Sequence, residues 1–189
     1  MKNIGIGIRF FCVMTLLVGI FYPCLMTVVG QGLFQEKANG GVIVHQEKTI
    51  GAHLIGQKFV QEKYFWPRPS AIDYQPLPSG GTNLGPTSLV LKKKVDERVI
   101  LFQKFSMEPI PPELLFTSGS GLDPHISVQG ALFQVPRVVR ARNFSEPQAL
   151  FQLIQDLKES PTFGFLGEER VNVLELNLAL DQKGKGQTP

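Results

Sequence analysis

The chain has 189 residues and a mass of 21.0 kDa, enough for one domain with a hydrophobic core and too little for a large multidomain enzyme. Hydrophobic residues make up 43% of it and charged residues 19%, and a mean hydropathy of +0.04 excludes a disordered chain. The net charge of +3 falls to +1 without Lys2 and Arg9, because 17 basic residues then face 16 acidic ones, so no nucleic-acid surface is expected.

The apolar residues concentrate near the amino terminus. Residues 10–29 read FFCVMTLLVGIFYPCLMTVV and contain no charge. A helix of about 20 residues crosses a hydrocarbon core of about 30 Å, whereas the apolar region of a signal peptide is usually about 7–15 residues long. Length therefore predicts a retained transmembrane helix over residues 10–30. The alternative is a cleaved signal, with Val28 and Gly30 as the small residues of a cleavage site.

Basic residues flank this segment on one side. Lys2 and Arg9 precede it, while residues 30–44 hold one Lys and one Glu. The positive-inside rule then places residues 1–9 in the cytoplasm and residues 31–182 outside the cell (inner) membrane, in the periplasm where there is one, followed by a frayed tail over residues 183–189. The exterior domain has no disulfide available, because both cysteines fall within the span.

The exterior part is predicted to be one α+β domain. Residues 50–55 favour a short strand, with which residues 58–66 could pair. The stretch over residues 67–86 contains Pro and Gly too often for a helix or a central strand, so it predicts a long loop. Beyond it, Thr87 or Ser88 can cap an amphipathic helix that ends near residue 105.

The second half of the domain combines short elements with breaks. Residues 114–118 favour a strand, and SGSGLDPHI over residues 118–126 predicts a loop. Ser127 can cap a second helix, which Pro136 is expected to divide into residues 128–134 and 136–142, with the kink exposing the side chains beside it.

Two further segments follow. Ser145 and Gln148 have the spacing of a capping box for a third helix, closed by Pro161. Apolar residues alternate from Val171 to Leu180, which fits a strand and equally a short buried helix.

The common catalytic motifs are absent from the sequence. No G-x-S-x-G, phosphate-binding loop or G-x-G-x-x-G occurs. Asp123 and His125 lie beside two serines, but side chains adjacent on one turn rarely converge on one atom, so a turn is the preferred interpretation over a hydrolase triad. The three histidines lack metal-ligand spacing, and no metal or other cofactor of the chain's own is expected.

Six strings carry a family resemblance. In chain order they are LLVGIFYPCL, GAHLIGQKF, YFWPRPSAIDYQPLPSGGTNLGPTS, SGSGLDPHIS, QVPRVVRARN and GFLGEERVNVLELNLALD. Together they closely resemble the C subunit, KdpC, of the Kdp-type potassium-transporting P-type ATPase. The resemblance runs from the span to about residue 181 and leaves the first ten residues and the tail unmatched.

The resemblance implies a non-catalytic accessory subunit in a complex with a potassium-channel-like subunit and a P-type ATP-hydrolysing subunit. The chain itself lacks D-K-T-G, the phosphorylated motif of such pumps. The family is described as raising the pump subunit's affinity for ATP, with the glutamine of Q-V-P-R, here Gln134 beside Arg137, proposed to help hold nucleotide. With residues 31–182 outside, Gln134 cannot touch cytoplasmic ATP, so any effect on ATP belongs to the complex and is indirect. The alternative role for both residues is structural, at the helix kink.

Contacts with the partner subunits are expected on the span and on the two glycine-containing loops. The candidate contact residues are Phe10, Tyr22, Pro23, Gly80, Gly81, Asn83, Gly85, Ser120, Gly121, Asp123 and His125. The four glycines among them are expected to adopt positive φ. The alternative function is that of a membrane-anchored extracytoplasmic binding protein or enzyme that acts alone.

Overall fold

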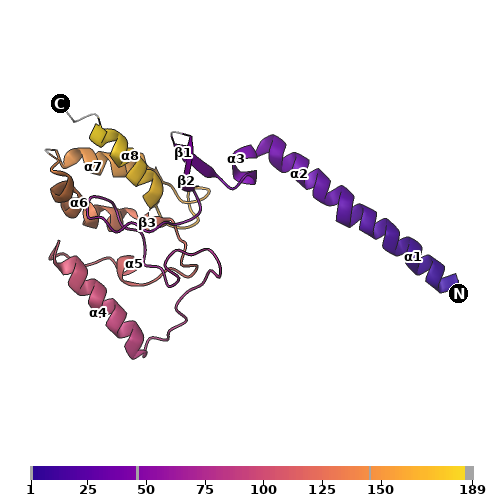
Figure 1. Cartoon of the computed structure of the whole chain (residues 1–189), viewed down its shortest axis with the longest axis horizontal. Coiled ribbons are helices and arrows are strands. Elements are labelled where there is room, and N and C mark those ends of the chain that lie inside the picture. The colour runs from indigo at the N-terminus through magenta and orange to yellow at the C-terminus, as the bar shows by residue number, and fades with distance from the viewer. Residues whose placement is uncertain (1, 46, 145, 186–189) are drawn as a thin grey trace. The chain divides into compact units, whose positions relative to one another are not determined.

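A computed structural model of the chain describes residues 2–45, 47–144 and 146–185. It divides into two compact units, Met1–Ile50 and Gly51–Pro189. The first holds a long apolar helix and most of a small hairpin, and the second combines helices with a three-stranded sheet (Figure 1). The predicted α+β class with one amino-terminal apolar helix is therefore confirmed.

The long helix is continuous from α1 (Lys2–Met14) through a π-helical turn, η1 (Thr15–Phe21), to α2 (Tyr22–Leu33). Its segment Asn3–Leu33 has 31 residues, a mean hydropathy of 2.2 in its most apolar stretch, and no buried side chain there. About 20 residues suffice to cross a bilayer, so this helix is long and apolar enough to be a single membrane span. A short helix, α3 (Gln35–Ala38), follows it.

The π turn explains how the helix passes Pro23. Proline lacks an N–H and its ring clashes with the carbonyl four residues earlier, so it usually kinks or breaks a helix. Here the preceding turn is wider, and Tyr22 N–H donates to Leu17 O, five residues back. Thr27 Oγ1 donates to Pro23 O at 2.8 Å on the other side. The backbone therefore adapts to Pro23 within the helix itself.

The predicted strand near residue 50 is present two residues earlier. It is β2 (Lys48–Ala52), and it pairs with β1 (Val42–His45) in a two-stranded sheet. The expected pairing with residues 58–66 is wrong, because that described segment forms no strand. The β-branched run V-I-V lies closer along the chain and makes a short hairpin possible.

The second unit contains five helices and three short strands among its described residues. The helices are α4 (Leu89–Gln103), α5 (Pro112–Leu115), α6 (Val128–Arg142), α7 (Gln148–Asp156) and α8 (Val173–Lys185). The strands are β3 (His125–Ser127), β4 (Lys158–Glu159) and β5 (Arg170–Asn172), antiparallel in the order β3-β5-β4. Residues 67–86, all described, form no helix or strand, as predicted.

The hydrophobic core lies where α6, α7 and α8 meet the sheet. Val138, Ile154 and Leu176 from these three helices are fully buried, as is Val171 of β5. Phe65 reaches the same core from an irregular segment and is also fully buried. Burial of one such side chain contributes about 1.5–3 kcal/mol, so this core is the main source of the unit's stability.

Two predicted helix caps are confirmed. Ser88 Oγ accepts a hydrogen bond from Leu91 N at the start of α4, and Ser127 Oγ accepts one from Gly130 N, at 2.9 Å, at the start of α6. A serine in this position satisfies one of the N–H groups that a helix start leaves unpaired.

Helix α6 corrects the expected division at Pro136. It runs unbroken from Val128 to Arg142 and ends at Asn143, whose φ of 53° makes a left-handed cap. Both ends are capped and one whole face is buried, which outweighs the single backbone hydrogen bond that Pro136 removes. Gln134 and Arg137, expected to be exposed at a kink, are 1% and 3% exposed.

The sequence predicts a strand over residues 114–118, a capping box before the third helix and a strand or helix in the tail. The strand over residues 114–118 is wrong, since Pro112 begins the one-turn helix α5 there. Helix α7 begins at Gln148 with Pro147 as its N-cap and no side-chain cap; Ser145, the expected cap, lies outside the described residues. The alternating tail is a three-residue strand, β5, followed by helix α8.

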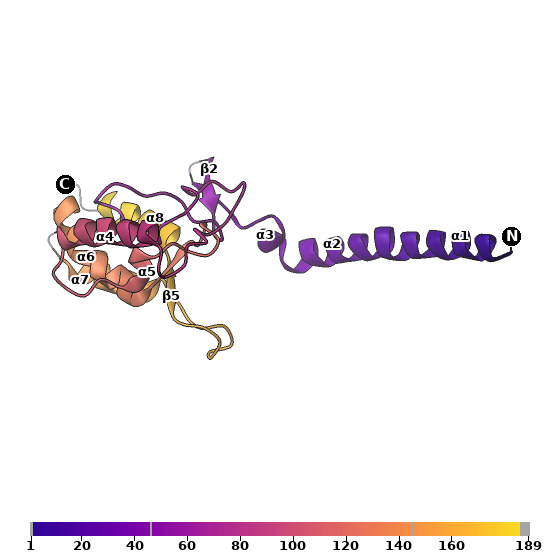
Figure 2. The ribbon, with the colours of Figure 1, turned by 90° about the horizontal axis from the view of Figure 1, so that it is seen from below.

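A finger-like loop joins β4 to β5. Residues 160–169 project from the second unit (Figure 2), and Thr162 and Leu166 bridge across it through a pair of 2.9 Å backbone hydrogen bonds. This segment, defined here as the finger, is treated below.

Candidate functional site

The two segments predicted as loops, residues 67–86 and 118–126, pack against each other and are called the loop layer. The loop prediction is wrong for His125 and Ile126, which begin strand β3. Ser118 N donates to Pro69 O at 3.1 Å, and Gly80 N donates to Ser120 O at 3.0 Å. The layer is tied to the segment after β2 by Gly56 N, which donates to Leu122 O at 2.7 Å. Backbone hydrogen bonds between loops this far apart in sequence hold both in defined conformations.

Glycine conformation in this layer differs in part from expectation. Of the four glycines expected at positive φ, only Gly121 has it, at 71°. A Cβ there would lie 2.6 Å from Ile72 Cγ1 and 2.9 Å from Gly80 O. The expectation for Gly80, Gly81 and Gly85 is wrong, and the positive φ nearby belongs instead to Asn83, at 51°. An asparagine tolerates this conformation better than most residues.

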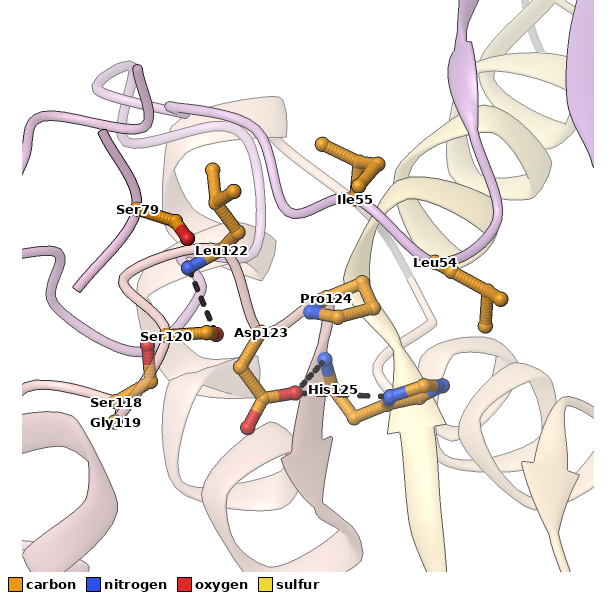
Figure 3. Close-up of a pocket in the computed structure, with 10 residues that line it drawn as sticks. All are labelled: Leu54, Ile55, Ser79, Ser118, Gly119, Ser120, Leu122, Asp123, Pro124 and His125. Carbon is orange, nitrogen blue, oxygen red and sulfur yellow. Dashed lines mark hydrogen bonds and ion pairs between the residues drawn. The ribbon is translucent and has the colours of Figure 1, made fainter. Parts of the chain in front are cut away.

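An open pocket of about 530 Å³ lies against the loop layer (Figure 3). Leu54 and Ile55 contribute apolar side chains to it, while Ser120, Asp123 and His125 contribute polar ones. Three of the predicted contact residues therefore line this one pocket. The remaining lining residues are Ser79, Ser118, Gly119, Leu122 and Pro124.

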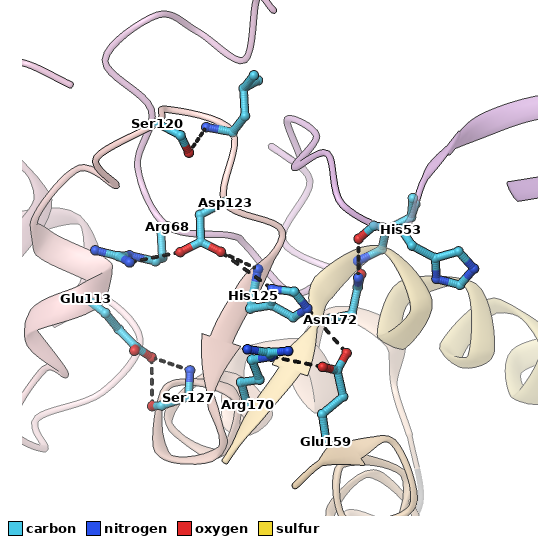
Figure 4. A network of polar contacts seen from close by, with 12 residues as sticks. His53, Arg68, Glu113, Ser120, Asp123, His125, Ser127, Glu159, Arg170 and Asn172 are labelled. Carbon is cyan, nitrogen blue, oxygen red and sulfur yellow. Dashed lines mark hydrogen bonds and ion pairs between the residues drawn. The ribbon is translucent and has the colours of Figure 1, made fainter. Parts of the chain in front are cut away.

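Asp123 and His125, which line this pocket, belong to a network of ion pairs and hydrogen bonds (Figure 4). Arg68 Nη1 donates to Asp123 Oδ2 at 2.9 Å, and His125 N donates to Asp123 Oδ1 at 3.0 Å. His125 Nε2 lies 3.3 Å from Glu159 Oε1, whose second oxygen accepts from Arg170 Nε at 2.9 Å. The network joins the loop layer to the sheet.

This network makes a hydrolase triad a poor description of the site. His125 Nδ1 lies 3.6 Å from Asp123 Oδ1 and its Nε2 faces Glu159, so both ring nitrogens face carboxylates. Ser120 Oγ accepts from Leu122 N, which fixes the loop. Within the described residues no group of three His, Cys, Asp or Glu side chains could hold a metal ion.

The network predicts a pH dependence of stability. Burial alone would raise the pKa of Asp123, but hydrogen bonds from His125 and Arg68 outweigh it and hold that pKa below its ordinary value of 3.8. A lowered pKa stabilises the fold above the unfolded-state value, and this contribution is lost as pH falls through the folded-state value. We expect the stability difference between wild type and Asp123→Asn, measured by urea unfolding, to shrink below about pH 4. A difference that grows with acidity would contradict this assignment.

Gln134 and Arg137, the other predicted pair, lie on one face of α6 and bind the chain's own backbone. Gln134 Oε1 accepts from Trp66 N at 2.8 Å, and Gln134 Nε2 donates to Trp66 O at 3.1 Å and to Gly130 O at 3.2 Å. Arg137 Nη2 donates to the same Oε1 at 2.7 Å. An amide side chain has two lone-pair sites and two N–H groups, so this set fills the capacity of Gln134.

Gln134, bound to the backbone of Trp66, and Arg137, bound to Gln134, are called the amide clamp. The guanidinium carbon of Arg137 lies 3.8 Å from the centroid of the Trp66 ring, and Nη1 donates to Glu62 O. Burial lowers the pKa of Arg137 to about 10, against a smaller opposing effect of Glu62, and the group stays charged at neutral pH. Cation–π contact and two hydrogen bonds stabilise this buried charge.

The side-chain amide of Asn177 binds the backbone of Phe65, the residue before Trp66, in the same way. Asn177 Oδ1 of α8 accepts from Phe65 N at 2.8 Å, and Asn177 Nδ2 donates to Phe65 O at 3.0 Å. Two helices therefore hold consecutive residues of one irregular segment through side-chain amides. Sequence reasoning did not identify Asn177, since its partner lies 112 residues away.

Fold and polar groups together define a class: a protein whose described residues form one apolar helix able to span a membrane and an α+β unit in which buried polar side chains bind the chain's own backbone. This architecture suits an accessory subunit better than an enzyme. The chain belongs to the family described as KdpC: K+-transporting ATPase, c chain, whose model matches residues 4–182. The match extends the sequence resemblance to nearly all of the amino-terminal segment.

Curated relatives of the chain belong to the same family. The potassium-transporting ATPase KdpC subunit of Leptospira interrogans is 46% identical over 182 residues, covering 95% of this chain and 94% of the relative. The KdpC subunit of Methylococcus capsulatus is 47% identical over 175 residues, with 89% and 92% covered, and that of Koribacter versatilis 46% over 191 residues, with 100% and 98% covered. The chain is therefore an accessory subunit of this potassium-pump family and not a catalytic enzyme by itself.

Proposed function

We propose that the chain assembles and stabilises a potassium-transporting ATPase complex of a channel-like subunit and a P-type ATP-hydrolysing subunit. The observation that carries this is the helix Asn3–Leu33, whose most apolar stretch has no side chain buried by the chain itself. Phe10 and Tyr22, two predicted contact residues, are 66% and 55% exposed on it. Such a surface is available to lipid and to the helices of a partner.

The second unit is proposed to lie outside the cytoplasm and to dock through its loop layer on the outer face of the channel-like subunit. The layer is preorganised by backbone hydrogen bonds, so docking would cost little ordering entropy. Asn83 and Gly85 are exposed on it. In this pose the subunit shapes ion entry or holds the complex together.

An effect on ATP affinity, in this proposal, is indirect. The clamp occupies both the oxygen and the nitrogen of the Gln134 amide, which supports a structural role over a direct bond to nucleotide. Any coupling to ATP would then pass through the partner subunits as a difference in their stability or conformation.

Co-purification tests the assembly role. A tagged copy of the full chain, expressed with the two larger subunits, should recover both from mild detergent, and omission of this chain should reduce recovery of one by the other. The control is the two larger subunits with an unrelated single-span protein. Equal recovery with and without this chain would contradict the assembly role.

Topology is tested separately. Lys2 and Arg9 precede the uncharged stretch over residues 10–29, and Glu36 with Lys37 follows the helix, so the positive-inside rule predicts a cytoplasmic amino terminus. A protease-sensitive tag placed after Gln182 should be cut in intact cells whose outer barrier has been opened. A tag cut only in inverted vesicles, or a mature amino terminus near residue 31, would show the orientation or the anchor to be wrong.

A further inference from the structure

The tip of the finger carries apolar side chains that the chain leaves open to solvent. Phe163 is 83% exposed, Phe165 75% and Leu166 52%. All three lie within four residues of the finger, the loop that projects from the second unit (Figure 2). Three large apolar residues gathered on one projection, away from any core, are typical of an interaction site.

Backbone hydrogen bonds fold the tip into a turn. Gly164 N donates to Pro161 O at 2.9 Å, in addition to the paired bonds between Thr162 and Leu166. At the base of the finger, Lys158 Nζ of β4 lies 2.7 Å from Oε1 of Glu169, the residue before β5. A rigid apolar anchor loses little entropy on binding.

The backbone of the tip also contains three residues with positive φ. Phe163 has a φ of 55°, which is rare for a bulky residue and costs about 1–2 kcal/mol. Gly164 and Gly167 have φ of 81° and 94°, although a Cβ at either would meet nothing within 4 Å. These glycines are therefore needed for backbone conformation and not for space.

We propose that the finger inserts Phe163 and Phe165 into an apolar pocket on the outer face of the channel-like subunit, with a basic residue at the rim of that pocket. The proposal deepens, and rests on, the assembly function above. Among the described residues Glu168 has no ion-pair or hydrogen-bond partner, while Glu169 is paired with Lys158 and Glu159 with Arg170. An unpaired acid beside two aromatic rings is complementary to a basic rim.

The charge of the finger argues against a lipid surface as the occupant. Peripheral segments that enter the bilayer interface flank their aromatic residues with Lys and Arg. Here the two residues that follow the glycine at the end of the tip are Glu168 and Glu169.

Photo-crosslinking identifies the occupant. The full chain carrying p-benzoylphenylalanine at position 163 is co-expressed with the two larger subunits and irradiated in membranes. The control carries it at position 107, where Met107 is 93% exposed outside the finger and the loop layer. We expect an adduct with the channel-like subunit from position 163 and none from position 107. An adduct with the ATP-hydrolysing subunit or with lipid alone, or none from position 163 although the wild-type complex co-purifies, would overturn the finger proposal.

A variant pair separates docking from folding. Phe163→Gly with Phe165→Ser should reduce recovery of the complex at least about tenfold, because buried aromatic anchors dominate interfaces. The melting temperature of the full chain should stay the same or rise by about 2–5 °C, since glycine relieves the positive φ. Met107→Ser should leave both unchanged. Recovery as in wild type, or a melting temperature that falls in parallel with recovery, would refute the proposal.

Charge reversal tests the rim. Glu168→Lys should lower recovery several-fold without changing melting, and wild-type or higher recovery would contradict a basic rim. If the wild-type complex itself is not recovered, the assembly function fails and the finger proposal with it, whereas recovery of the wild type with no finger effect removes only the finger proposal.

Discussion

Gln134→Leu should lower the free energy of unfolding by about 3–5 kcal/mol, one of the largest single-residue effects in this chain. The change removes both hydrogen bonds to the Trp66 backbone and the acceptor of Arg137 Nη2, all in a buried site. Each buried polar group left unpaired costs about 1–3 kcal/mol, and more if charged. Urea unfolding of the full chain in detergent, followed by tryptophan fluorescence, measures this directly, because Trp66 is the sole tryptophan.

A matched control lies on the same helix. Gln129 is exposed on α6, so Gln129→Leu makes the same chemical change with no clamp to break. It should change the free energy of unfolding by less than about 0.5 kcal/mol. If Gln134→Leu is as stable as Gln129→Leu yet weakens ATP binding by the complex, the clamp is unimportant and the nucleotide role attributed to this glutamine by resemblance gains support.

The parts of the fold that could be predicted from sequence are those set by neighbouring residues. Ser88 and Ser127 cap helices whose apolar faces repeat within a few residues, so cap and helix were both visible in the sequence. The loop over residues 67–86 follows directly from its proline and glycine content.

Sequence-based predictions are wrong where tertiary packing outweighs a local rule. Pro136 is expected to divide α6, but burial of one continuous face keeps the helix whole. The first two residues of strand β3 lie in a segment predicted as a loop. The strand pairs with β5, 43 to 47 residues away in sequence, and its three residues show no alternation long enough to detect. Strand pairing at such separation leaves no local signal.

The sequence predicts only part of the candidate site, because most contacts in it join residues far apart in the chain. Resemblance singled out Gln134 and Arg137, and their spacing of three on a helix places them together. Their common partner, Trp66, is 68 residues from Gln134, and nothing in the sequence indicates that an amide will bind its backbone. The ion pairs that link Asp123 and His125 to Arg68, Glu159 and Arg170 were missed because each partner comes from a different element.

The second large effect is expected at Gly121. Its φ of 71° penalises any side chain by about 1–2 kcal/mol, and a Cβ at 2.6 Å from Ile72 Cγ1 forces the loop layer apart at a further cost of about 1–3 kcal/mol. Gly121→Val should therefore lower the free energy of unfolding by about 2–5 kcal/mol. Thermal melting of the full chain, alongside recovery of the complex, checks both consequences.

Gly85→Val is the control for this change, because Gly85 lies in the same layer without positive φ and a Cβ there meets nothing within 4 Å. It should melt like wild type. The control also reports on docking, since Gly85 is exposed on the surface proposed to meet the channel-like subunit. A wild-type melting temperature with reduced recovery for Gly85→Val would support docking through the loop layer independently of folding. Normal recovery of both variants would refute it, because Gly121→Val deforms the layer and Gly85→Val places a bulky side chain on its surface.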